Sequence, residues 1–74
     1  MELKIAVPES LREGETLVTT ALEDLGAMRL SGREWRYEGI LKTPSELRAK
    51  LEDKLKKDYG KDKQQLAGQL EITG

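Results

Sequence analysis

Cysteine, histidine, asparagine and phenylalanine are all absent from this chain of 74 residues. Without cysteine the chain can form no disulfide, no thiolate metal site and no thiol nucleophile. Without histidine it lacks the commonest metal ligand and the commonest general base near neutral pH, and its serines have no histidine to activate them. The glycines and carboxylates also lack phosphate-loop or metal-loop spacing. We therefore expect a protein that is not an enzyme and that binds no metal and no small-molecule cofactor.

Long apolar runs are absent as well. No stretch approaches the roughly 18 consecutive apolar residues that a membrane span needs. The chain begins with an alternating strand pattern instead of a signal peptide. These features predict a cytoplasmic protein that has no membrane partner.

The composition indicates one small domain covering residues 1–74. Charged and hydrophobic residues each make up 36% of the chain, which is typical of a thin core under a heavily charged surface. The net charge of −1 hides an asymmetry, because residues 1–26 carry −4 and residues 27–74 carry +3. That imbalance can orient a partner, but it is far from the basic excess of a dedicated duplex-DNA binder.

Two helices are predicted from periodicity and capping residues. Apolar residues spaced along one face predict a first helix from Glu15 to Leu25, and Gly26 follows where a C-terminal glycine belongs. In the second helix, Thr43 can act as the N-cap, followed by proline at the first helical position and by Glu46 of a capping box. This helix is expected to continue to Tyr59 and to stop at the glycine after it.

Strand patterns occupy the rest of the chain. Residues 2–7 alternate as a half-buried strand that ends at a proline. Gly32-Arg33 fits a two-residue hairpin turn, which would place Leu30 opposite Trp35 and Met28 opposite Tyr37. After a polar loop at residues 61–65, four residues of one parity predict a last strand from Leu66 to Thr73; they are Leu66, Gly68, Leu70 and Ile72.

The order strand, helix, strand, strand, helix, strand predicts an α+β fold. The expected arrangement is the ferredoxin-like split β-α-β (βαββαβ), with a four-stranded antiparallel sheet and two helices on one face. In this arrangement Met28–Ser31 and Leu66–Thr73 are the outer strands. The opposite, open face is expected to be polar and mixed in charge, and to carry Lys4, Ala6, Arg29, Ser31, Glu34, Arg36, Glu38, Ile40, Lys42, Gln69 and Glu71.

Trp35 and Tyr37 admit two interpretations. The hairpin register puts them on the apolar face, which favours a role in the core. Alternatively, aromatic side chains beside arginines could stack on the bases of single-stranded RNA or DNA while basic side chains hold the phosphates. That nucleic-acid-binding hypothesis uses Arg29, Arg33, Arg36 and Lys42.

The preferred hypothesis is a small non-catalytic binding or regulatory module that acts through protein-protein contacts. A domain of this size gains stability by burying more surface, and a homodimer is the simplest means. Self-association could use one of the edge strands, Met28–Ser31 or Leu66–Thr73, or the open face of the sheet. The predicted interface is the last edge strand, through Leu66, Gly68, Leu70 and Ile72. Two alternatives stay open. One is the nucleic-acid-associated protein, and the other is a small phage- or plasmid-type inhibitor of a host protein.

Overall fold

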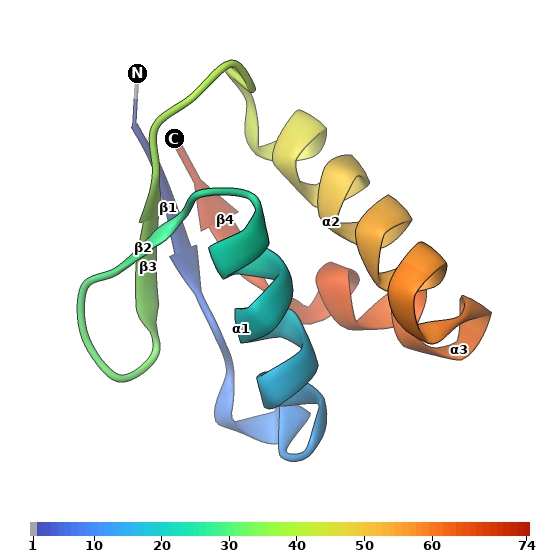
Figure 1. Cartoon of the computed structure of the whole chain (residues 1–74). Helices are drawn as coiled ribbons and strands as arrows, with labels where there is room; N and C mark the ends of the chain where they lie inside the picture. Colours follow the sequence, from blue (N-terminus) through green and yellow to red (C-terminus); the bar gives the residue numbers. More distant parts are fainter. Residues whose placement is uncertain (1) are drawn as a thin grey trace.

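The computed structural model describes residues 2–74, which form a four-stranded antiparallel sheet and three helices (Figure 1). The strands lie in the order β2-β3-β1-β4, so β2 and β4 are the edges. Two 3₁₀ segments, η1 and η2, complete the elements. Along the chain these are β1 (Leu3–Ala6), η1 (Glu9–Leu11), α1 (Gly14–Asp24), β2 (Met28–Arg29), β3 (Glu34–Tyr37), α2 (Pro44–Tyr59), α3 (Lys61–Gln64), η2 (Gln65–Gln69) and β4 (Glu71–Thr73).

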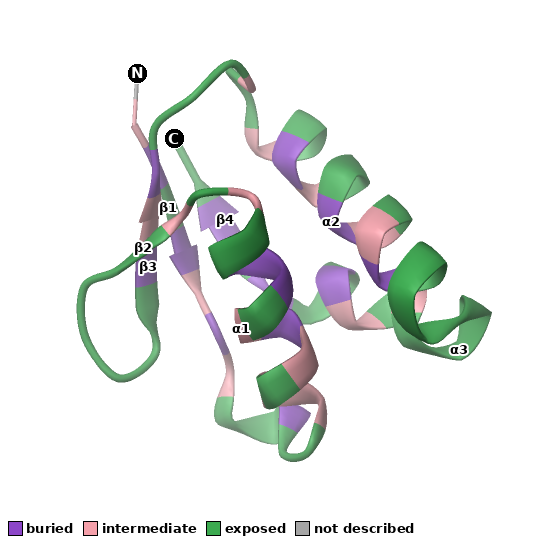
Figure 2. Ribbon diagram, viewed as in Figure 1, coloured by how far each residue is buried: buried purple, intermediate pink, exposed green. Residues whose placement is uncertain are grey.

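The core lies between the sheet and the helices α1 and α2, which cover one face of the sheet. Figure 2 shows the buried residues of both helices turned toward the strands. The α+β class and the antiparallel four-stranded sheet are therefore as predicted. The buried hydrophobic residues are Leu3, Ile5, Val7, Leu11, Val18, Ala21, Leu22, Trp35, Tyr37, Leu47, Leu51, Leu55, Ala67, Leu70 and Ile72. Among residues 2–74, no helix combines the length and the apolar character that crossing a bilayer requires.

The helix ends form where their capping residues predict them. After α1, the amide of Ala27 donates to the carbonyl of Leu22 at 2.9 Å, and Gly26 has a φ of +91°. This is a Schellman C-cap, which needs a residue that tolerates the left-handed conformation. At the start of α2, the hydroxyl of Thr43 accepts a hydrogen bond from the amide of Glu46 at 3.2 Å. Both boundaries depend on contacts within five residues, so local sequence determines them.

The predicted register of the β2–β3 hairpin is wrong by one residue. Arg29, not Leu30, lies opposite Trp35, and Met28 lies opposite Arg36. The amide of Leu30 donates to the carbonyl of Glu34 at 2.8 Å, so the loop contains three residues instead of two. Because side chains alternate along a strand, this shift moves Met28 and Leu30 from the core face to the open face.

The last strand is shorter than predicted. Residues 61–69, expected as a polar loop and the start of a strand, form α3 and η2, and β4 begins only at Glu71. The 3₁₀ segment buries Ala67 completely and is tied to α2, because Arg48 Nη1 donates to the Ala67 carbonyl at 2.6 Å. The prediction of a strand is therefore wrong for Leu66 and Gly68, while Ile72 lies in β4 as expected.

Candidate functional site on the open face of the sheet

The face of the sheet opposite the helices is organised in cross-strand rows. Lys4 on the central strand β1 lies opposite Thr73 on one side and Arg36 on the other, and Met28 continues the row on β2. Directly opposite residues of antiparallel strands have their Cβ atoms about 5 Å apart and project from the same face. We call this set, Thr73, Lys4, Arg36 and Met28, the Lys4 row. Its two charged members are both basic.

The neighbouring row has the opposite charge. Ala6 lies between Glu71 of β4 and Glu34 of β3, and Leu30 follows at the edge because its amide is bonded to the Glu34 carbonyl. We call this set, Glu71, Ala6, Glu34 and Leu30, the Ala6 row. Two carboxylates therefore flank the small Ala6 side chain, one row away from two basic side chains.

Both rows end in an exposed apolar side chain at the β2 edge of the sheet, Met28 within β2 and Leu30 directly after it. Met28 is 58% exposed and Leu30 is 51% exposed. Single apolar side chains on a surface are ordinary, but here two lie at one edge of the sheet beside rows of opposite charge. The open face thus combines apolar side chains at one edge with charges of both signs.

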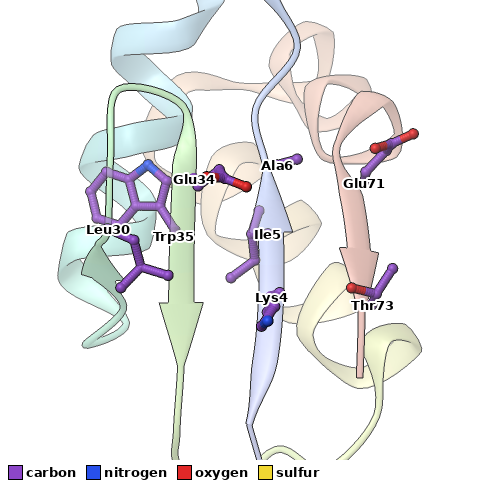
Figure 3. Close-up of a pocket in the computed structure, with 8 residues that line it drawn as sticks. All are labelled: Lys4, Ile5, Ala6, Leu30, Glu34, Trp35, Glu71 and Thr73. Atoms are coloured by element: carbon purple, nitrogen blue, oxygen red, sulfur yellow. The ribbon is translucent and has the colours of Figure 1, made fainter.

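A hollow of about 290 Å³ lies on this face. The residues that line it surround Ala6 and come from β1, β3, β4 and the residue after β2. They include Lys4, Leu30, Glu34, Glu71 and Thr73. Figure 3 shows these side chains around Ala6, with Glu34 and Leu30 on one side and Glu71 and Thr73 on the other. The hollow exists because alanine fills little of the space between its longer neighbours, and its two carboxylates suit a cationic group.

The charged groups of the open face differ in how they are held. Arg36 Nε lies 3.6 Å from Glu38 Oε1, and Arg36 Nη2 lies 3.7 Å from Met28 Sδ. The hydroxyl of Ser31 donates to Glu34 Oε1 at 3.1 Å. Lys4, by contrast, is exposed and makes no ion pair with any residue from 2 to 74. Its ammonium group is therefore free to meet a partner.

Trp35 belongs to the core, as the preferred interpretation predicts. It is 2% exposed, and Tyr37 is 6% exposed. The guanidinium carbon of Arg29 lies 5.0 Å from the centre of the Trp35 ring, on the helix side of β2. Arg29 therefore covers the indole and does not lie on the open face, which corrects the predicted composition of that face.

The four residues of the nucleic-acid hypothesis do not gather into one patch. Arg29 covers Trp35, and Arg33, in the hairpin loop, forms an ion pair with Glu15 of α1. Arg36 lies on the open face, and Lys42 is exposed in the loop before α2. Because Trp35 and Tyr37 are both buried, neither side chain is available to stack on a base beside these charges.

The four residues of the predicted edge-strand interface are also dispersed. Leu66 is half-buried in η2, and its Cδ2 would approach a Cβ on Gly14 to 2.9 Å, so it packs against α1. Leu70 and Ile72 are buried in the core, and Gly68 is exposed in η2. Their side chains contribute to folding more than to an exposed surface.

Sequence reasoning missed the apolar part of the candidate site. Strand parity alone places five of its residues on the open face: Lys4, Ala6, Glu34, Arg36 and Glu71. Met28 and Leu30 reach that face only through the shift in hairpin register, which parity does not reveal. Within residues 2–74, no three acidic, histidine or cysteine side chains cluster as a metal site requires. Comparisons with protein-family models, with curated proteins and with solved structures find no match to this chain.

Proposed function

We propose that this chain is a small non-catalytic binding module that acts through protein-protein contacts made by the open face of its sheet. The observation that carries the proposal is the exposure of Met28 and Leu30 beside two rows of opposite charge. Methionine and arginine are enriched in protein interfaces, and the buried centre of an interface is more apolar than the rest of the protein surface. Charges of both signs around them give a partner a fixed orientation.

The fold assignment supports this proposal only as a scaffold. The strand order β2-β3-β1-β4, with the helices on one face, fits a ferredoxin-like split β-α-β arrangement, and we propose that assignment. Such a sheet leaves one face uncovered and therefore open to a partner. The fold by itself specifies no function, so the proposal depends on the side chains of that face. We also propose that the module acts in the cytoplasm, which suits a chain without cysteine.

The nucleic-acid hypothesis takes second place because its residues are used elsewhere in the fold. Arg29 and Arg33 contact Trp35 and Glu15, and glutamates interleave with the remaining basic residues of the sheet. Interleaved acids weaken the positive field that phosphates need. An inhibitor of a foreign protein would be one form of the proposed binding module.

A photocrosslinking experiment tests the proposed surface. Benzoylphenylalanine replaces Leu30 in one version of the chain and Lys56, which is exposed on α2, in a control version. Irradiation in cells that express the chain should give defined protein adducts from position 30 and few from position 56. A captured protein, which can be the chain itself, must then bind the purified chain and lose that binding with Met28→Ser and Leu30→Ser together. Equal adducts from both positions, or binding that survives the double substitution, would contradict the proposal.

A further inference from the structure

We infer that the partner of the open face is a second copy of this chain, packed face to face with its strands antiparallel to those of the first. This inference rests on the proposed function and names its partner. It follows from the order in which charged, small and apolar side chains occur in the two cross-strand rows.

A two-fold axis provides the matching geometry. The axis lies in the gap between the two facing sheets, parallel to both, perpendicular to the strands, and midway between the Lys4 row and the Ala6 row. Rotation about it places the Lys4 row of one copy over the Ala6 row of the other, while each strand stays above its own counterpart. Because the operation is two-fold, every contact occurs twice, as in any isologous dimer.

The central contact joins Lys4 to the hollow of the second copy. Under this rotation Lys4 lies over the partner's Ala6, the residue at the base of the hollow of about 290 Å³. The partner's Glu34 and Glu71 line that hollow, so a cationic side chain enters between two carboxylates. Stacked sheets lie about 10 Å apart, a gap that suits a long side chain facing a short one.

The other positions of the two rows match as well. Arg36 lies over the partner's Glu34, and Met28 lies over the partner's Leu30. The first contact pairs opposite charges, and the second buries the two exposed apolar side chains at the β2 edge against each other. The small area of a four-stranded face with short strands predicts a dimer at the weak end of specific interfaces.

The alternative orientation is electrostatically unfavourable. A two-fold axis parallel to the strands would superimpose each row on its own copy, so that the Lys4 rows would meet each other and the Ala6 rows would meet each other. Basic side chains would then face basic ones, and carboxylates would face carboxylates, an arrangement that costs free energy. The charge pattern therefore selects the antiparallel orientation.

Charge exchange between the two rows tests this geometry. Sedimentation velocity over a concentration series should show reversible dimerisation of the wild-type chain that weakens with added salt. Lys4→Glu places a carboxylate between two others, and Glu71→Lys places an ammonium beside Lys4. Each substitution alone should raise the dimer dissociation constant by about tenfold or more. An equimolar mixture of the two variants should dimerise more tightly than either variant alone, because one of the two symmetry-related contacts is then native and in the other the new carboxylate meets the new ammonium.

A matched pair of variants controls for overall charge. Lys56→Glu and Glu23→Lys make the same changes in net charge at exposed helix positions, so each should dimerise like the wild type and their mixture should show no gain. A chain that stays monomeric at every concentration, or a Lys4→Glu variant that dimerises normally, overturns the inference. The proposed function survives that result if position 30 still crosslinks to a different protein that binds through Met28 and Leu30, and fails with it if no such protein is found.

Discussion

The two faces of the sheet are built from the same strands, yet adjacent residues on those strands differ in burial and in charge. On the helix side, Ile5, Trp35 and Ile72 are 1%, 2% and 8% exposed and form part of one core. On the open side, their immediate neighbours Lys4 and Glu34 are exposed and charged. Because successive side chains of a strand point to opposite faces of the sheet, one strand supplies both buried core residues and exposed charged residues.

The edge strand β2 shows how sensitive this separation is. Its two residues pair with β3 one position away from the register that would bury Met28. As a result, Met28 and the following Leu30 lie on the open face and not on the core face. A shift of one residue has converted part of the core pattern into a candidate contact surface. The contrast between the faces is therefore strict on β1 and β3 and reversed on β2.

The largest expected loss of stability comes from a substitution on the core side of β1, compared with its neighbour on the open side. Ile5→Ala removes a side chain that is 1% exposed, and should lower the free energy of unfolding by about 2–5 kcal/mol. Lys4→Ala, the adjacent substitution on the open face, should change it by less than about 0.5 kcal/mol. Urea denaturation, monitored by Trp35 fluorescence at concentrations where the chain is monomeric, measures both.

The size of the domain requires a milder companion variant. A chain of this length has a total stability of only about 4–11 kcal/mol, so Ile5→Ala can unfold it outright. Ile5→Val, with an expected loss of about 0.5–1.5 kcal/mol, keeps the comparison measurable. Losses of similar size from Lys4→Ala and Ile5→Val would show that the two faces do not differ as the structure indicates.

The parts of the fold that depend on local chemistry were predictable from sequence. Thr43 caps the start of α2 as predicted, and Gly26 and Gly60 both have a positive φ, a conformation that glycine adopts readily. Each involves residues within one turn of the helix end, where side-chain chemistry and allowed backbone angles decide the outcome. The class of fold follows from the order of these elements.

The parts that depend on competition between distant contacts were not predictable. The amide of Val7 donates to the Arg33 carbonyl at 2.8 Å, which extends the β1–β3 pairing, so β3 pairs over a longer stretch with the distant β1 than with the neighbouring β2. Leu66 and Gly68 share one parity with Leu70 and Ile72, which predicts a strand, but packing of Ala67 and Leu66 against the helices favours a 3₁₀ segment. Short apolar runs fit either structure, so tertiary packing decides between them.

For the candidate site, sequence placed the charges and missed their apolar neighbours. Parity along β1 and β3 put Lys4, Glu34 and Arg36 on the open face. No pattern within the sequence indicated that Met28 and Leu30 would join them, because that result depends on a register set by hydrogen bonds at the hairpin loop.

A second, smaller effect should come from Arg29, the charged residue on the helix side of β2. Its guanidinium covers the Trp35 ring at 5.0 Å, so Arg29→Ala should expose the indole, shift its emission to longer wavelength and lower stability by about 0.5–1 kcal/mol. Arg36→Ala, on the open face, should leave the emission unchanged.

In the wild type, a single-stranded oligonucleotide at low salt should not quench Trp35. Quenching that disappears at higher salt would favour the nucleic-acid hypothesis instead.

The smallest expected change in stability concerns Lys54. Lys4 makes no ion pair within residues 2–74, whereas Lys54 contacts two aspartates, one on each of the helices that cover the sheet. Lys54 Nζ lies 3.3 Å from Asp24 of α1 and 3.3 Å from Asp58 of α2. Hydrogen bonds to Asp24 and then to Asp58 raise the pKa of Lys54 above its ordinary value of 10.5. Since the raised pKa belongs to the folded state, the stabilisation is complete below pH 10.5 and is lost as the pH rises through the folded-state pKa.

The difference in free energy of unfolding between the wild type and Lys54→Met isolates this contribution. It should be constant from pH 7 to pH 9 and should shrink above pH 10.5. Lys56→Met, at an exposed lysine outside these ion pairs, controls for the loss of one positive charge and should change the free energy of unfolding less at neutral pH. Because Lys54 is partly exposed, solvent screens both contacts, and added salt should reduce the difference at neutral pH as well. A difference for Lys54→Met that stays constant through the alkaline range would mean that the lysine acts through the packing of its methylene stem between α1 and α2, and not through its charge.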